Sequence, residues 1–274
     1  MTGHARRLGR PLAIAAIAVA IAAALITADG KGVAGAYVVA PRPGAAAPAT
    51  DAAVLALPLK GKIVGIDPGH NGLNYTDPSY IDRQVWNGRE WENCDTTGTE
   101  TDSGYTEALF NFRVAGYLRA DLIRDGAKVV MTRTTNKGVG PCVTTRSYTI
   151  NRGHANVAVD IHADGAPAWG RGFAILEPVA DGPNDKVIGS SARLGADIRA
   201  AMLADTKMPT SNYDGQNGIT HRDDLAGLNL TKVPKILIEV GNMKNATDAK
   251  MLTSAKFQQL VARTLLAAII KFLR

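Results

Sequence analysis

The chain has 274 residues, of which 46% are hydrophobic and 20% are charged, and its formal net charge is +6. This ordinary globular composition argues against a disordered or fibrous protein. The first 36 residues carry four basic side chains and one acidic one, so this segment accounts for +3 and the remainder for the other +3. A weakly basic chain without a stripe of Lys and Arg gives no indication of nucleic-acid binding.

An N-terminal targeting segment is indicated by the order of its residues. Three arginines among the first ten residues precede an uncharged apolar run over residues 11–28, and Ala34-Gly35-Ala36 supplies an A-x-A-like cleavage site. We therefore expect residues 1–36 to be a signal peptide and the protein to be exported to the periplasm, the cell wall or the medium. An uncleaved membrane anchor is the alternative, because the apolar run just reaches a spanning length.

The rest of the chain divides into a linker and one folded domain. Residues 37–58 are rich in Ala and Pro and carry almost no hydrophobic pattern, which predicts an extended linker. Strands and helices then alternate over residues 59–274. The hydrophobic pattern predicts strands over 62–66, 128–132, 157–161, 172–176 and 236–239, and helices over 107–124, 145–155, 190–204 and 257–272.

This alternation predicts an α/β domain with a mostly parallel, twisted central sheet and helices on both faces. Two long segments, 71–104 and 206–232, are rich in Gly, Asn, Asp and Thr, and we expect them to be irregular loops. Loops of this length in a compact domain are usually functional. We expect them to form the walls of a substrate groove, with Arg222 and Asn229 as candidate substrate contacts.

The chain has two cysteines, Cys94 and Cys142. In an exported protein a single disulfide is the expected state of such a pair. Joint metal binding is the alternative, but cysteine-based zinc sites usually contain closely spaced C-x-x-C pairs. We therefore expect a disulfide.

Two histidines lie where a functional site is expected. His70 follows the first predicted strand and His162 follows the third; in parallel α/β folds, sites lie beyond the carboxyl ends of the strands. Neutral imidazole is a common zinc ligand, and a catalytic zinc takes three protein ligands. Glu107 is a candidate third ligand. Because it opens a predicted helix and no local motif such as H-E-x-x-H is present, spacing alone favours a different role for it, a favourable interaction with the helix dipole.

Glu239 ends the apolar run Ile236-Leu237-Ile238. A carboxylate at such a position is costly unless it is paired or used in catalysis. Near a metal-activated water it would serve as general base and acid. A structural ion pair with Arg133 or Lys244 is the alternative.

Other common catalytic motifs do not fit the sequence. The segment 65–72 contains three glycines, but it lacks the Gly-Lys-Ser/Thr ending of a phosphate-binding loop. No Gly-x-Ser-x-Gly element indicates a serine hydrolase. The sequence therefore gives no indication of a phosphate-binding loop or of a serine nucleophile.

Four segments in chain order resemble the motifs of the zinc-dependent N-acetylmuramoyl-L-alanine amidases of the Amidase_3 family. They are Ile66-Asp67-Pro68-Gly69-His70-Asn71-Gly72, Ser103-Gly104-Tyr105-Thr106-Glu107, Val159-Asp160-Ile161-His162-Ala163-Asp164 and Ile238-Glu239-Val240-Gly241-Asn242-Met243-Lys244-Asn245. The resemblance spans about residues 60–273. Further segments, such as Asp224-Leu225-Ala226-Gly227-Leu228-Asn229, resemble the small mycobacterial-type amidases that consist of a catalytic domain only.

The resemblance implies a peptidoglycan hydrolase that cleaves the amide bond between N-acetylmuramic acid and L-alanine. It implies one zinc ion per chain, held by His70, Glu107 and His162, with Glu239 as catalytic acid/base, and a disulfide between the two cysteines. Competing interpretations are an inactive binding protein with the same fold and a zinc peptidase that cuts within the stem peptide. We expect a monomer, and the sequence assigns no role to His154 and His221.

Overall fold

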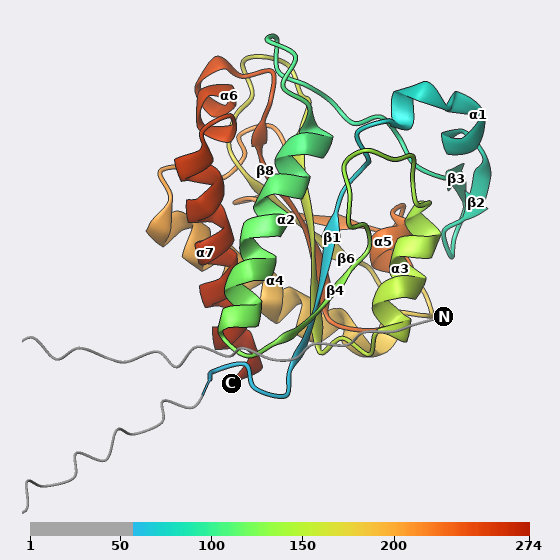
Figure 1. Ribbon diagram of the computed structural model, residues 1–274, viewed down its shortest axis with the longest axis vertical. Helices are drawn as coiled ribbons and strands as arrows, with labels where there is room; N and C mark the ends of the chain where they lie inside the picture. The colour runs from blue at the N-terminus through green and yellow to red at the C-terminus, as the bar shows by residue number, and fades with distance from the viewer. Residues whose placement is uncertain (1–56) are drawn as a thin grey trace, which may run out of the picture. The chain divides into compact units, whose positions relative to one another are not determined.

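A six-stranded sheet forms the centre of the computed structural model, which describes residues 57–274 (Figure 1). Its strands are β1 (Ile63–Pro68), β4 (Lys128–Met131), β5 (Val157–Asp164), β6 (Ala174–Pro178), β7 (Ile219–Arg222) and β8 (Lys235–Asn242). The spatial order is β4-β1-β5-β8-β6-β7, and only the β6–β8 pair is antiparallel. The mostly parallel α/β sheet predicted from the alternating pattern is confirmed.

Helices cover both faces of this sheet, as predicted. The longer ones are α2 (Glu107–Arg124), α4 (Ile188–Asp205) and α7 (Ala255–Leu273), which pack on one face (Figure 1). The opposite face carries α3 (Val143–Arg152) and the short α5 (Ala226–Asn229). The short helix α6 (Ala246–Leu252) follows β8, and a turn of 3₁₀ helix over Asp185–Val187 leads into α4.

The two faces of the sheet are chemically different because successive side chains of a strand alternate between them. The main apolar core lies beneath α2, α4 and α7, and the central strands contribute Val157, Val159, Ile161, Ala163, Ile236, Ile238 and Val240 to it. The intervening positions of β5 and β8 carry charged or polar side chains toward the face of α3 and α5, among them Asp160, His162, Lys235 and Glu239. One face therefore stabilises the domain and the other carries its chemistry.

The segment 71–104 is more ordered than the sequence predicted. It contains a 3₁₀ turn (Asn74–Thr76), the short helix α1 (Pro78–Ile81) and an antiparallel hairpin of β2 (Gln84–Trp86) and β3 (Trp91–Asn93). The second predicted loop, 206–232, likewise contains β7 and α5. The prediction of two irregular loops was wrong in this respect. These elements are short and are stabilised by individual side-chain contacts, so the sequence shows no regular hydrophobic pattern that would reveal them.

All three tryptophans of the chain are exposed, whereas tryptophan is on average strongly buried in proteins. Trp86 and Trp91 pair across the hairpin with their ring centroids 5.6 Å apart and are 47% and 65% exposed. Trp169 lies in the connection between β5 and β6 and is 68% exposed.

The predicted signal segment, residues 1–36, and almost all of the predicted linker, residues 37–58, lie outside the described residues. Among residues 57–274, none of the helices is both long enough and apolar enough to cross a membrane.

Candidate active site

Four predicted site residues meet at the carboxyl ends of the central strands. His70 follows β1 directly, and His162 and Glu239 are register partners on the neighbouring strands β5 and β8. Glu107 enters from the first turn of α2, whose N-terminus is capped by the Thr106 side chain. The topology thus brings together residues separated by up to 169 positions in the sequence.

The turn after β1 places the two histidines in close contact. His70 adopts a left-handed backbone conformation with φ 56°, which is uncommon for a non-glycine residue. Gly69 lies directly against the His162 ring, and a Cβ atom there would be only 2.1 Å from the ring atoms Cε1 and Nε2. Only glycine fits at this position, and the imidazole centroids of His70 and His162 are 4.9 Å apart as a result.

His70, Glu107 and His162 converge on one point. Their ligand atoms all lie within 4.8 Å of one another. His70 Nε2 is 3.2 Å from Glu107 Oε2, and His162 Nδ1 is 2.8 Å from Glu107 Oε1. Ligands at about 2.0–2.2 Å from a tetrahedral zinc lie roughly 3.3–3.6 Å apart. The two measured separations are slightly shorter than this spacing, and two imidazole nitrogens with one carboxylate form a ligand set that zinc takes in catalytic sites.

The remaining ring nitrogens of both histidines have partners of their own. His70 Nδ1 lies 3.0 Å from the carbonyl oxygen of Thr96, and His162 Nε2 lies 3.4 Å from Asp160 Oδ1. A partner of this kind fixes the tautomer and leaves the opposite nitrogen free as a ligand. Each imidazole therefore turns its other nitrogen toward Glu107, at 3.2 Å for His70 and 2.8 Å for His162.

The electrostatics of the cluster favour a bound cation. Burial opposes ionisation of Glu107, but the neighbouring imidazoles outweigh it and hold its pKa well below the usual value. Burial also disfavours the charged form of His70, yet Glu107 and Asp95 raise its pKa to about 9. Positive charge is therefore stabilised between these ligand atoms.

Glu239 lies beside this cluster in a pocket of about 400 Å³ that His70, Glu107 and His162 also line. Its side chain is partly exposed to the pocket, while Oε2 is buried and has no hydrogen-bond partner among the described residues. Burial raises the pKa of Glu239 to about 8. A carboxyl group in this condition is suited to accept and release a proton near neutral pH.

The alternative ion pairs for Glu239 do not form. Arg133 points elsewhere and donates to the carbonyl oxygens of Pro68, Gly69 and Ala108. Lys244 lies 3.7 Å from Asp102. Glu239 therefore remains without a cationic partner from either residue.

Comparison with known proteins identifies the family. Residues 64–271 match the family described as N-acetylmuramoyl-L-alanine amidase, Amidase_3. The N-acetylmuramoyl-L-alanine amidase of Mycobacterium tuberculosis is 40% identical over 222 residues, which cover 78% of this chain and 88% of that protein. The chain belongs to the N-acetylmuramoyl-L-alanine amidase family.

Further relatives agree with this assignment. The crystal structure of the amidase Ami1 from Mycobacterium smegmatis superposes with a TM-score of 0.74 at 38% identity and covers 78% of this chain and 98% of its own. The germination-specific amidase of Bacillus subtilis is 27% identical over 231 residues, covering 79% of this chain and 81% of that protein. This amidase thus shares both sequence and fold with members of the family.

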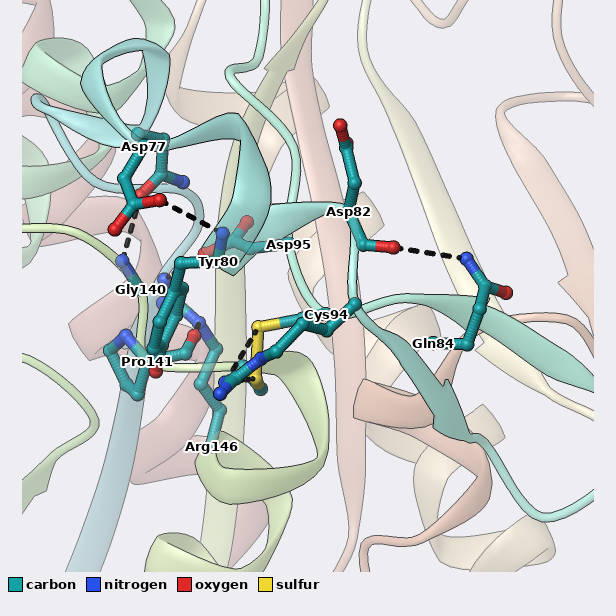
Figure 2. The surroundings of a disulfide bond; sticks show 12 residues. Asp77, Tyr80, Asp82, Gln84, Cys94, Asp95, Gly140, Pro141 and Arg146 are labelled. Atoms are coloured by element: carbon teal, nitrogen blue, oxygen red, sulfur yellow. Dashed lines mark hydrogen bonds and ion pairs between the residues drawn. A yellow bond between two sulfur atoms is a disulfide. The ribbon is translucent and has the colours of Figure 1, made fainter.

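The predicted disulfide is present in this amidase. Cys94, at the end of the hairpin, is bonded to Cys142, which caps the start of α3 (Figure 2). Arg83 donates to Cys142 Sγ at 3.2 Å. Because Asp95 follows Cys94 directly, the disulfide also holds the segment that passes beside His70.

The two candidate substrate contacts differ in position. Arg222 lines the pocket of Glu239 and forms a two-pronged ion pair with Asp224, at 2.7 and 2.6 Å. Asn229 is fully buried and donates to the carbonyl oxygen of Asp223 at 2.7 Å. The structure therefore corrects the prediction for Asn229: this residue stabilises the loop behind Arg222 instead of facing the pocket.

His154 and His221 lie away from the cluster. His154 occupies the turn after α3 with φ 50°. His221 is exposed on β7, and its Nε2 is 3.6 Å from Glu177 Oε2 on the adjacent strand. Neither histidine contributes a ligand atom to the His70–Glu107–His162 cluster.

Sequence reasoning missed a group of buried charges behind the two histidines. No role was predicted from the sequence for Asp67, Asp95, Asp160 or Lys235. One signal was available: Asp160 and Lys235 interrupt or open strongly apolar strands, where an ionised side chain requires a partner. The identity of those partners depended on the sheet order, which the pattern did not specify.

Proposed function

We propose that this amidase cleaves the amide bond between N-acetylmuramic acid and L-alanine in peptidoglycan, using one zinc ion held by His70, Glu107 and His162. The observation that carries this proposal is the convergence of three candidate ligand side chains beside Glu239, whose Oε2 atom is buried and has no hydrogen-bond partner among the described residues. Three protein ligands leave a coordination position open, which is the arrangement of catalytic zinc.

The reaction follows from the positions of these groups. When bound, zinc would polarise the carbonyl group of the scissile amide and lower the pKa of water in the site to about 7. Glu239 would take a proton from the attacking water as its oxygen bonds to the carbonyl carbon. Glu239 would then pass this proton to the nitrogen of L-alanine as the carbon–nitrogen bond breaks. Its raised pKa suits both steps.

The substrate groove is formed by the loops around the pocket. The walls near Glu239 include the segment 96–99 and residues Arg222 and Leu225. We propose that Arg222 contacts the substrate, because its guanidinium lines this pocket while Asp224 fixes its orientation.

The test is mass spectrometry of muropeptides digested by residues 37–274, with and without a zinc chelator. We expect chelator-sensitive release of peptides with a free N-terminal L-alanine. Glu239→Gln should retain one equivalent of zinc and lose turnover by at least about 10²-fold, the usual contribution of a general acid/base.

The matched control is Glu177→Gln, which alters another buried strand glutamate that lies outside the pocket of Glu239. This variant should keep its activity. Cleavage within the stem peptide would replace the amidase assignment with that of a zinc peptidase. Zinc binding without any product would favour an inactive binding protein.

We also propose that residues 1–36 are a signal peptide, that 37–58 are a linker and that 59–274 form the catalytic domain of an exported monomer. The disulfide between Cys94 and Cys142 supports this proposal, because such bonds persist in oxidising compartments outside the cytosol.

A further inference from the structure

A buried lysine lies between two carboxylates behind the histidines. Asp67 on β1 and Asp160 on β5 are register partners on neighbouring strands, and both are buried. Like charges placed directly opposite each other in a sheet repel. Lys235, at the start of β8 and only 1% exposed, places its Nζ atom 2.9 Å from Asp67 Oδ2 and 3.2 Å from Asp160 Oδ2.

Asp160 carries this interaction to one of the candidate zinc ligands. Asp160 and His162 stand two positions apart on β5, so their side chains share a face of the sheet. While Asp160 Oδ2 contacts Lys235, Asp160 Oδ1 lies at ion-pair distance, 3.4 Å, from His162 Nε2 and makes no hydrogen bond among the described residues. One carboxylate therefore joins the lysine to the ring nitrogen that faces away from Glu107.

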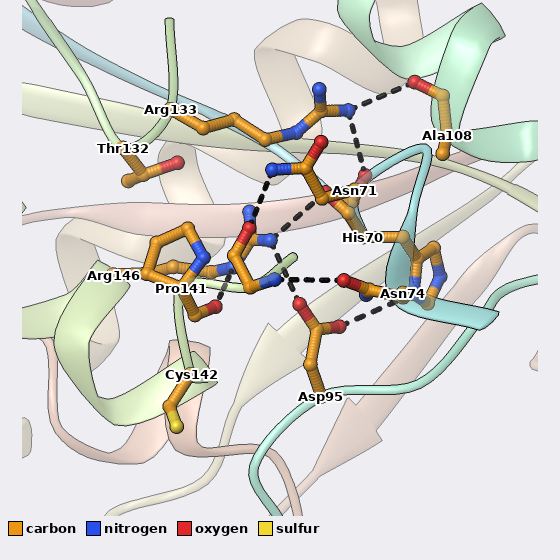
Figure 3. Close-up of polar contacts among 12 residues, drawn as sticks. His70, Asn71, Asn74, Asp95, Ala108, Thr132, Arg133, Pro141, Cys142 and Arg146 are labelled. Carbon is orange, nitrogen blue, oxygen red and sulfur yellow. Dashed lines mark hydrogen bonds and ion pairs between the residues drawn. The ribbon is translucent and has the colours of Figure 1, made fainter. Parts of the chain in front are cut away.

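A second branch starts from Asp67 and reaches the other candidate ligand. Arg146 Nη1 contacts Asp67 Oδ1 at 3.1 Å, and its Nη2 contacts Asp95 Oδ2 at 2.9 Å. Asp95 Oδ1 lies 3.5 Å from His70 Nδ1, and Arg146 also donates to the carbonyl oxygen of His70 at 2.9 Å (Figure 3). The two imidazoles are thus the ends of one continuous series of buried charged groups.

Stability alone is a poor explanation for this series. Removing several charges from water costs free energy that their mutual attraction often fails to recover, and apolar side chains of similar volume are frequently at least as stabilising. The series does place one carboxylate oxygen within 3.5 Å of the outer nitrogen of His70 and another within 3.4 Å of that of His162. Such acceptors orient a metal ligand and raise its basicity.

We infer that Lys235 is a positioning residue for the metal site, holding Asp160 so that His162 presents its inner nitrogen to a divalent cation. This inference rests on the proposed function, because the cation is the zinc of the proposed reaction. Lys235 itself contacts neither the three ligand side chains nor Glu239; it acts through Asp160.

The test uses Lys235→Met, which keeps the length of the side chain and removes its charge, and Asp160→Asn, which keeps its shape. Each variant is freed of metal and titrated with zinc in competition with a chromophoric chelator. We expect the Kd for zinc to rise by about 10–100-fold, as found for groups that support metal ligands. The Co²⁺-loaded variants should also show a shifted visible absorption spectrum.

The double variant Lys235→Met/Asp160→Asn should bind zinc about as weakly as the weaker single variant, because both changes remove the same support. Asp248→Asn is the control. Asp248 is fully buried and binds the backbone nitrogens of Gly172 and Asn242, away from the histidines. This variant should lower the Tm and leave the Kd for zinc and the Co²⁺ spectrum unchanged.

An unchanged Kd and Co²⁺ spectrum in Lys235→Met would overturn the inference, whatever Asp160→Asn shows, because Asp160 lies against His162 itself. If Lys235→Met does not fold, Lys235→Gln, which also removes the charge, is measured in its place. Failure of the unaltered protein to bind one equivalent of zinc would instead contradict the proposed function, so the two failures are distinguishable.

Discussion

Single side chains decide the charge state of the cluster. Burial lowers the pKa of both imidazoles, but the facing carboxylates outweigh it and raise the pKa of His70 to about 9 and that of His162 well above its usual value. Both imidazoles therefore hold protons near neutral pH. A zinc ion must displace these protons, since only the neutral imidazole binds metal.

This displacement predicts how zinc stabilises the protein as pH changes. A raised histidine pKa stabilises the metal-free fold below pH 6.5, and this contribution is lost as pH rises toward about 9. Zinc binding becomes stronger over the same range. We expect the increase in Tm caused by zinc to grow from pH 6.5 to about 9, as measured by differential scanning fluorimetry with an external dye. A smaller increase at higher pH would contradict the protonated state of these histidines.

The residues of the site were easier to predict from the sequence than the buried charged residues that contact them. Strand ends and spacing indicated His70, His162 and Glu239 because chemistry in parallel α/β folds collects at the carboxyl ends of strands. Glu107 remained ambiguous from spacing alone, since the first turn of a helix also favours an acid. In the structure the two roles are compatible, because Glu107 opens α2 and its carboxylate also contacts both imidazoles. The partners of Lys235 required the strand order, which periodicity does not encode.

Among the elements, those with a continuous buried face matched their predictions best. The predicted helix 107–124 coincides with α2, whose buried positions recur at helical spacing. The segment 71–104 was predicted less well because its elements depend on individual contacts. Asn87, for example, is fully buried and binds the carbonyl oxygen of Asp224, 137 residues away in sequence. Contacts of this kind leave no periodic signal.

The disulfide is the strongest of the links that hold this segment. Replacing both Cys94 and Cys142 by Ala should lower the free energy of unfolding by about 2–5 kcal/mol, the usual cost for a small exported domain. Denaturant unfolding followed by circular dichroism measures the difference. Reductant should destabilise the unaltered protein and leave the double variant unaffected, because the chain contains no other cysteine. Equal stability of the two proteins would contradict this role.

At the scale of the whole molecule, we expect export to precede the formation of this bond. The sequence pattern predicts cleavage after Ala36, so the mature protein should begin at Tyr37. Expression with the native N-terminus in a bacterial host, followed by intact-mass measurement of the exported fraction, tests this. A full-length mass confined to the membrane fraction would establish the anchor instead.

The exposure of the three tryptophans affects what the intrinsic fluorescence of this protein can measure. With Trp86, Trp91 and Trp169 all in contact with water, we expect the folded chain to emit at a wavelength close to that of hydrated indole. Complete unfolding should therefore change the emission wavelength little. Two of these tryptophans lie on the hairpin of β2 and β3. Glu92 and Asn93, which follow Trp91 on β3, line a pocket beside the histidines. Intrinsic fluorescence is thus a poor gauge of folding here and a sensitive local probe of the active-site rim.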